Sequence, residues 1–284
     1  MRRFLLPAVA VIAILIGCAA ALAWLSASRI DVARLARETP RTTALMQARA
    51  REAAAAGRAF RAEQHWVPYE SISPLLRRAV LVAEDDAFFS HSGLDWNEIR
   101  ASARKNLEKR SFVRGGSTIT QQLAKNLWLS DRRTLTRKLE EAFLAVRLER
   151  ALPKRRIFEL YLNLIEWGDG VFGVEAAARH WFGVPASELD ARQAVLLAAV
   201  IINPRRYSPL EPSRRTERRA RMIATRMRRR GALDEEAYRF AIGERPRPAP
   251  VDTSGPWLAP RWIPPADTVR AAPADSIGSP APGP

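Results

Sequence analysis

Two segments in the first half of the chain carry residues that could do chemistry together. Glu84, Asp85 and Asp86 follow the apolar run 79–83, and burial beside such a run can lift the pKa of a carboxyl group toward that of a working general base. The second segment, 114–126, reads RGGSTITQQLAKN and predicts a polar loop that turns into a helix. Its glycines allow close approach to a ligand, its hydroxyl and amide groups can hold sugar or phosphate oxygens, and its lysine adds a positive charge. A carboxylate with a cationic phosphate site indicates transfer from a phosphate-activated donor.

Each segment also has an ordinary structural explanation. Adjacent acids are common on solvated helix faces, and a glycine pair before Ser-Thr is often a loop that leads into a helix N-cap. Either segment alone would favour that explanation over a catalytic one.

Taken together, the two segments resemble the first two motifs of the peptidoglycan glycosyltransferases, glycosyltransferase family 51. The family patterns read Glu-Asp-x-x-Phe-x-x-His-x-Gly and Gly-x-Ser-Thr-Ile-Thr-Gln-Gln-x-x-Lys-Asn. The matching residues in this chain are Glu84, Asp85, Phe88, His91, Gly93, Gly115, Ser117, Thr118, Ile119, Thr120, Gln121, Gln122, Lys125 and Asn126. Chance agreement over so many positions is negligible.

A third segment, 137–143, reads RKLEEAF and matches the family's third motif, Arg-Lys-x-x-Glu, with Lys138 as its lysine and Glu141 as its acid. Without the resemblance, an exposed helix with an ion pair between Arg137 and Glu141 would explain the spacing. Arg133, just before this segment, falls at the position of a phosphate-binding arginine in the family.

Apolar spacing in the third segment predicts one buried helix face. Leu139, Phe143 and Val146 recur at helical intervals and define that face. Glu141 lies well off it, so we expect the acid on another side of the helix.

The segments 156–163 and 166–183 match the fourth and fifth motifs, which are mainly scaffold. Glu159 and Asn163 fit helix-to-loop hydrogen bonding about as well as substrate contact, and Asn163 is kept as a substrate-binding candidate. The Glu-Trp-Gly form of the fifth motif resembles most the monofunctional, membrane-anchored biosynthetic branch found in Gram-negative bacteria.

Bifunctional relatives also carry a transpeptidase with Ser-x-x-Lys, Ser-x-Asn and Lys-Ser/Thr-Gly motifs. Segment 102–105, SARK, fits the first pattern, but the printed sequence lacks the other two and too little chain follows. We interpret Ser102 as a coincidence and expect no transpeptidase activity.

The resemblance implies a mainly α fold, with a lysozyme-like helical main lobe, a smaller membrane-associated jaw lobe and one N-terminal transmembrane helix. It implies polymerisation of lipid II into linear β-1,4 glycan, with inversion at the anomeric carbon and release of undecaprenyl pyrophosphate. Glu84 would be the general base, and Glu141 the second catalytic acid, which holds cations or a divalent ion. The implied substrate-binding residues are Asp85, Ser117, Thr118, Gln121, Gln122, Lys125, Asn126, Arg133, Lys138 and Asn163. No cofactor is required, although Mg²⁺ or Mn²⁺ bound with the substrate pyrophosphate is left open.

Two other functions compete with this one. A lytic glycosidase also uses a glutamate in a helical, lysozyme-like domain. A catalytically silent scaffold in a cell-wall complex would use only the anchor and the basic surface. The intact Glu84 and Glu141 favour an enzyme over the scaffold.

Composition narrows the partners. The 284 residues carry a net charge of +16, which in a soluble protein would put nucleic acid first, but the sequence contains no recognisable nucleic-acid module. Anionic membrane surfaces and pyrophosphates attract the same side chains, so we interpret the charge as membrane-facing. The single cysteine, Cys18, rules out an intramolecular disulfide, and the three histidines have no metal-ligand spacing. The expected partners are lipid II, the growing glycan, membrane lipid and cell-wall synthesis or division proteins.

Composition also divides the chain into five parts. They are a basic cytoplasmic leader (1–3), an apolar transmembrane anchor (4–25), an Ala- and Arg-rich stalk (26–64), the glycosyltransferase domain (65–243) and a disordered Pro/Ala-rich tail (244–284). A cleaved signal peptide, or a lipobox ending at Cys18, is the alternative to the anchor. The anchor would hold the chain in the bacterial inner membrane with its catalytic domain in the periplasm.

Apolar periodicity predicts that helices dominate the domain, with hardly any strand. The expected helices are 74–84, 95–109, 118–127, 132–150, 154–163, 174–182, 190–201 and 214–230. The apolar residues Leu107, Phe112 and Val113 are candidates for contact with the membrane.

Overall fold

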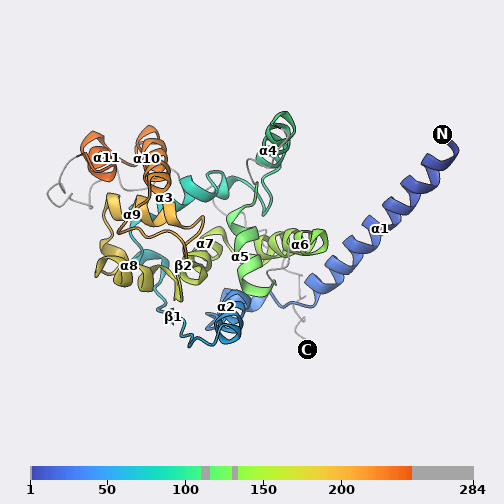
Figure 1. The fold of residues 1–284 in the computed structure, drawn as a ribbon, viewed down its shortest axis with the longest axis horizontal. Helices are drawn as coiled ribbons and strands as arrows, with labels where there is room; N and C mark the ends of the chain where they lie inside the picture. The colour runs from blue at the N-terminus through green and yellow to red at the C-terminus, as the bar shows by residue number, and fades with distance from the viewer. Residues whose placement is uncertain (1, 110–115, 130–133, 245–284) are drawn as a thin grey trace, which may run out of the picture. The chain divides into compact units, whose positions relative to one another are not determined.

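The computed structural model describes residues 2–109, 116–129 and 134–244, with side chains from residue 13 onward (Figure 1). Three predictions therefore fall outside the described residues: the phosphate-binding role of Arg133, the membrane contact of Phe112 and Val113, and the tail from residue 245 on.

The described chain is mainly α-helical, as predicted. Its α-helices are α1 (Arg2–Ser28), α2 (Ala44–Ala55), α3 (Pro74–Glu84), α4 (Trp96–Glu108), α5 (Ile119–Trp128), α6 (Leu135–Ala151), α7 (Lys154–Leu164), α8 (Val174–Phe182), α9 (Ala191–Val200), α10 (Arg214–Arg229) and α11 (Glu235–Ala241). The helices expected within the domain all form, and α3 and α8 have the predicted bounds. Helix α11 was not predicted.

Three short strands form a small sheet that was not predicted. β1 (Glu63–Gln64) pairs parallel with β3 (Val171–Phe172), which pairs antiparallel with β2 (Glu166–Gly168). Strands of two or three residues are too short to produce a readable alternation. Gly173 follows β3 with φ 79°, and a Cβ there would lie 2.6 Å from the carbonyl oxygen of Asn163, so the turn into α8 requires glycine.

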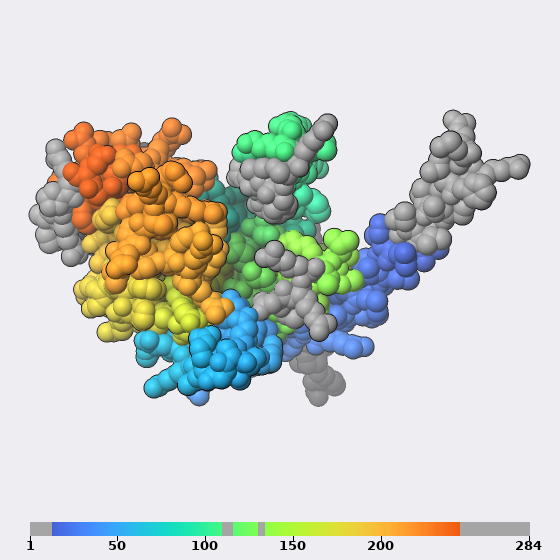
Figure 2. Space-filling model, in the orientation of Figure 1, coloured from blue at the N-terminus to red at the C-terminus, as the bar shows by residue number. Residues whose placement is uncertain are grey.

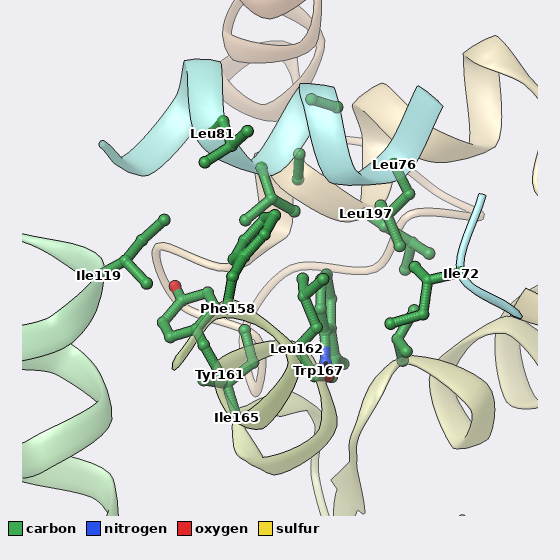
Figure 3. Packing of buried hydrophobic residues seen from close by; sticks show 14 of the residues in the cluster. Ile72, Leu76, Leu81, Ile119, Phe158, Tyr161, Leu162, Ile165, Trp167 and Leu197 are labelled. Carbon is green, nitrogen blue, oxygen red and sulfur yellow. Dashed lines mark hydrogen bonds between the residues drawn. The ribbon is translucent and has the colours of Figure 1, made fainter. Parts of the chain in front are cut away.

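The hydrophobic core positions the last turn of α3. Leu76 and Leu81 of α3 face Phe158 and Leu162 of α7, with Ile119 reaching in from α5 (Figure 3). Helix α9 packs against α3, α10 and α11, and α5 packs against α6 and α7. Because one face of α3 is buried in the core and the helix ends at Glu84, the core fixes where that carboxyl group lies.

The buried face of α6 differs from the prediction. Its fully buried positions are Glu141, Leu144, Ala145 and Leu148, whereas Leu139, Phe143 and Val146 are only partly buried. The reason is that α6 packs on two sides, against α5 and against α1, so it has no single apolar stripe. Glu141 therefore lies on the core side, where the apolar spacing did not place it.

The predicted stalk is part of the folded unit from about residue 32. Val32, Leu35 and Met46 are buried, and α2 packs against α5. Arg49 of α2 donates from Nε to both carboxylate oxygens of Glu166, at 3.1 and 2.9 Å. A few apolar side chains and one buried ion pair thus dock part of the segment that the composition predicted to be a stalk, and the expected boundary at residue 65 falls inside the fold.

Helix α1 covers the range of the predicted anchor. Near its end, Ser26 donates to Glu140, and the carbonyl oxygen of Ala27 accepts from Arg147, which fastens α1 to α6. Among the residues that the structure describes, no helix combines the length and the apolar character needed to cross a membrane.

Candidate active site

Glu84 lies at the C-terminal end of α3 with its carboxylate held between two other helices. Gln122 of α5 donates to its Oε2 at 3.0 Å, and Arg219 of α10 donates to its Oε1 at 2.7 Å. Only 12% of the side chain is exposed. Burial raises the pKa of Glu84 above its usual value, although Arg219 and the bond from Gln122 oppose the rise. The predicted desolvation of this acid is therefore present.

Tyr161 sets the orientation of Gln122. Its hydroxyl group donates to Gln122 Oε1 at 3.1 Å, so the amide NH₂ group of Gln122 must point toward Glu84. The ring is fully buried, and burial, followed by the charge of Glu84, raises the pKa of Tyr161 well above its usual value. Tyr161 consequently stays a neutral donor, and Figure 3 shows it inside the core. Tyr161 lies within the segment that matches the fourth motif, 156–163, but no sequence pattern marked it as a site residue.

Arg219 is a second site residue that the sequence did not predict. It stands in a helix with many arginines, and no local signal separates it from its neighbours. Besides Glu84 it donates to the carbonyl oxygen of Ala83 at 3.3 Å. Only the packing of α10 against α3 identifies it.

Asp85 orients structure beside the base. Its carboxylate accepts from the backbone N–H of Ile119, in the first turn of α5, at 2.9 Å, and it bonds His91 Nε2 at 3.1 Å. The other ring nitrogen of His91 accepts from the N–H of Gly93 at 3.2 Å, which places the proton on Nε2. An anion at the start of a helix is favourable, so Asp85 anchors α5 against the end of α3. The structure therefore gives this substrate-binding candidate a role in orienting the start of α5.

Thr118 and Gln121 form the N-terminal capping box of α5. The Thr118 hydroxyl accepts from the N–H of Gln121 at 3.2 Å, and the Gln121 side chain accepts from the N–H of Thr118 at 3.0 Å. Both side chains are buried. The structure therefore gives these two substrate-binding candidates a capping role, in which they hold the loop rather than face a ligand.

A second polar cluster joins α6 to the start of α5. Lys138 donates to Ser117 Oγ at 2.8 Å and to Glu141, and Arg137 donates to Glu141 Oε2 at 3.1 Å. Glu141 is buried, with 4% of its side chain exposed, whereas 45% of the Lys138 side chain is exposed. Glu141 thus holds two cations, one of which reaches the polar loop before α5.

This cluster does not fit a divalent ion. Both carboxylate oxygens of Glu141 accept hydrogen bonds from cations, and a metal ion would have to displace Arg137 and Lys138. Among the described residues, no group of three acids, histidines or cysteines is arranged to hold a metal ion.

The remaining candidates divide into exposed and buried side chains. Lys125 is exposed on α5, one turn beyond Gln122, whereas Asn126 is buried. Asn163 is fully buried: it accepts from the N–H of Val67 at 3.0 Å and donates to its carbonyl oxygen at 2.9 Å. Of the two roles that the sequence left open for Asn163, the structure favours helix-to-loop bonding over substrate contact.

The assembled site can take up a proton next to a cationic surface. Glu84 is a shielded carboxylate with two fixed donors, and Asp85 ties it to the N-terminus of α5. Ser117 precedes that N-terminus and accepts a hydrogen bond from Lys138, which also pairs with Glu141. This arrangement suits removal of a proton from a hydroxyl group as an anionic leaving group departs.

Comparison with known proteins shows the family of this chain. Residues 51–228 match the family described as transglycosylase. A biosynthetic peptidoglycan transglycosylase of Laribacter hongkongensis is 51% identical over 188 residues, 66% of this chain and 82% of the relative. One from Nitrosomonas eutropha is 49% identical over 66% of this chain and 77% of the relative, and one from Methylobacillus flagellatus is 54% identical over 58% and 72%.

The region that matches the family, 51–228, contains Glu84, Gln122, Glu141 and Arg219, so these site residues all lie within it. The chain belongs to the transglycosylase family.

Proposed function

We propose that this protein is a monofunctional peptidoglycan glycosyltransferase that joins lipid II units into linear β-1,4 glycan and releases undecaprenyl pyrophosphate. The observation that carries the proposal is the shielded Glu84 carboxylate, held by Gln122 and Arg219 within motifs that match the family. The names of the relatives, biosynthetic peptidoglycan transglycosylases, support the same reaction class.

Glu84 acts as the general base. It removes the proton from the 4-hydroxyl group of the acceptor sugar as the oxygen attacks the anomeric carbon of the donor, and the bond to the diphosphate breaks in the same step. One displacement inverts the configuration at that carbon. Burial supports this role because it raises the basicity of Glu84, while Gln122 and Arg219 keep the ionised form in place.

Cations of α5 and α6 stabilise the leaving diphosphate. Lys138 is held between Ser117 and Glu141, so its charge is positioned before the reaction begins. Lys125 and Arg133 contribute further charge in this proposal. Glu141 acts through Lys138 and Arg137 and does not touch the reacting atoms.

The enzyme works at the inner membrane with its catalytic domain in the periplasm. The lipid tails of both substrates require a membrane surface, and residues 4–25 supply an apolar anchor behind a basic leader. Helix α4 carries two exposed large apolar side chains, Trp96 at 60% and Leu107 at 81%, which suit a lobe that rests on lipid.

A polymerisation assay with purified lipid II tests the function. We expect the full chain to consume lipid II and to form glycan strands that muramidase digests. A parallel incubation uses purified murein in place of lipid II. Release of soluble reducing or anhydro sugars from murein, together with no consumption of lipid II in the first assay, would contradict the proposal and indicate a lytic enzyme.

A further inference from the structure

A pocket of about 320 Å³ opens between the end of α9 and the first half of α10. Arg215, Arg218 and Arg219 line it together with Tyr207, and Ile202 and Met222 supply apolar wall. Figure 2 shows the surface of residues near 200–230, in orange, on the near face of the molecule. The pocket is therefore an accessible cavity with cationic walls.

The two outer arginines have no acidic partner within the described part of the chain. Arg215 and Arg218 are exposed and form no ion pair there. Four other arginines of this region are paired, Arg219 with Glu84, Arg221 with Glu244, Arg228 with Glu235 and Arg230 with Asp86, whereas no ion pair is formed within the described residues by Arg214, Arg226 or Arg229. The positive charge at this pocket is thus left available for an anion.

Arg219 connects the pocket to the catalytic acid. It lines the pocket and also donates to Glu84 at 2.7 Å. Gln122 of α5 donates to the other carboxylate oxygen of Glu84, and the loop before α5 holds Ser117, which accepts a hydrogen bond from Lys138 of the α5–α6 cluster. In an in-line displacement, the attacking hydroxyl group and the leaving group lie on opposite sides of the anomeric carbon. Because the leaving diphosphate is assigned to the α5–α6 cations, we assign the α10 pocket to the acceptor substrate.

We infer that the pocket formed by Tyr207, Arg215, Arg218 and Arg219 is a subsite for an anionic group of the acceptor substrate. The inference rests on the proposed polymerisation of lipid II. The acceptor carries carboxylates on its peptide stem and a diphosphate at its lipid end, and guanidinium groups bind either anion. Its attacking sugar would lie at Glu84, and an anion held by α10 would fix the register of that sugar.

The test compares the full chain with two double variants of equal charge. Arg215→Gln with Arg218→Gln removes the two unpaired cations of the pocket. Arg214→Gln with Arg229→Gln removes two exposed arginines of the same helix that do not line it. Initial rates of glycan formation are measured in detergent against lipid II concentration. We expect the pocket variant to raise KM about tenfold with kcat changed less than about threefold, because two charge-assisted contacts to the bound acceptor are lost. The control variant should stay near wild type.

A second substrate identifies the anion. If the stem carboxylates are the ligand, lipid II with an amidated stem will raise KM for the wild type but not further for the pocket variant. If the diphosphate is the ligand, amidation will change neither enzyme, and the pocket variant will still show its higher KM.

Equal KM values for the pocket and control variants would overturn the subsite while leaving the proposed function intact. An unchanged KM in detergent together with weaker binding of the pocket variant to phosphatidylglycerol vesicles would also overturn it and assign the pocket to membrane lipid. Failure of wild type and control alike to form glycan would overturn the proposed function, and the subsite with it.

Discussion

Neutralising Glu84 should abolish polymerisation with little effect on the fold. Glu84→Gln keeps the size of the side chain and removes its capacity to take a proton. A positioned general base contributes about 10² to 10⁴ in rate, which corresponds to about 3–5 kcal/mol of activation free energy. We therefore expect kcat to fall by about a thousandfold in the lipid II assay.

The contacts of Glu84 limit the change in stability. Because Tyr161 directs the amide NH₂ of Gln122 at position 84, and Arg219 directs a second donor there, a glutamine can accept from only one of them through its single oxygen. One lost hydrogen bond costs about 1 kcal/mol, and the weakened contact with Arg219 costs about as much again. The neutral glutamine avoids the free-energy cost of burying the charged carboxylate, and this offsets part of the loss. Thermal unfolding should shift by a few degrees only, far too little to explain the loss of rate.

Asp86 offers a matched control for charge. It lies two residues after Glu84, and it pairs with Arg230 at an exposed position, with 37% of each side chain exposed. Asp86→Asn should change kcat less than about threefold, since an exposed ion pair contributes about 1 kcal/mol or less. Equal losses in the two variants, or more than a tenth of wild-type turnover in Glu84→Gln, would refute the assignment of the base.

The same geometry supports three further predictions. Because burial raises the pKa of Glu84 and the base works ionised, kcat/KM should fall as the pH drops through that raised pKa, at a higher pH than for an ordinary glutamate. Arg219→Gln removes a positive charge that lowers this pKa, so it should move the acid limb of the pH–rate profile to a still higher pH. Asn163→Ala should lower the free energy of unfolding by about 3 kcal/mol in urea titrations, since the N–H and carbonyl groups of Val67 lose their partners, while KM stays unchanged in the folded fraction. Leu107→Ser should weaken sedimentation with lipid vesicles, because 81% of this apolar side chain is exposed on α4.

Each of these has a result that would count against it. An acid limb that does not respond to Arg219→Gln would mean that another group titrates. A raised KM with unchanged stability in Asn163→Ala would restore this residue as a substrate contact. For Leu107, the control is Leu210→Ser, an exposed leucine outside α4, with 58% of the residue exposed. Equal vesicle binding by both variants and the wild type would remove α4 from the membrane contact.

The sequence alone was enough to predict most helices of the domain and to select two acids as candidate site residues. Apolar residues at helical spacing located α3 and α8 to their ends, and the motif residues selected Glu84 and Glu141 as candidates. Both signals are local: one depends on which residues share a helix face, and the other on residues within a short segment.

The surroundings of these acids depend on contacts between distant segments, and only the tertiary structure decided them. Arg219 reaches Glu84 because α10 packs against α3, and nothing near residue 219 in the chain distinguishes it from its neighbouring arginines. Glu141 is buried because α6 is covered on two sides, which apolar spacing along one helix cannot show. Likewise, the sequence allowed two equally good roles for Asn163, and its contacts with the loop at Val67 decide between them. Local pattern determines which residues form an element, whereas the packing of elements far apart in the chain determines which polar groups meet and how far water is excluded from them.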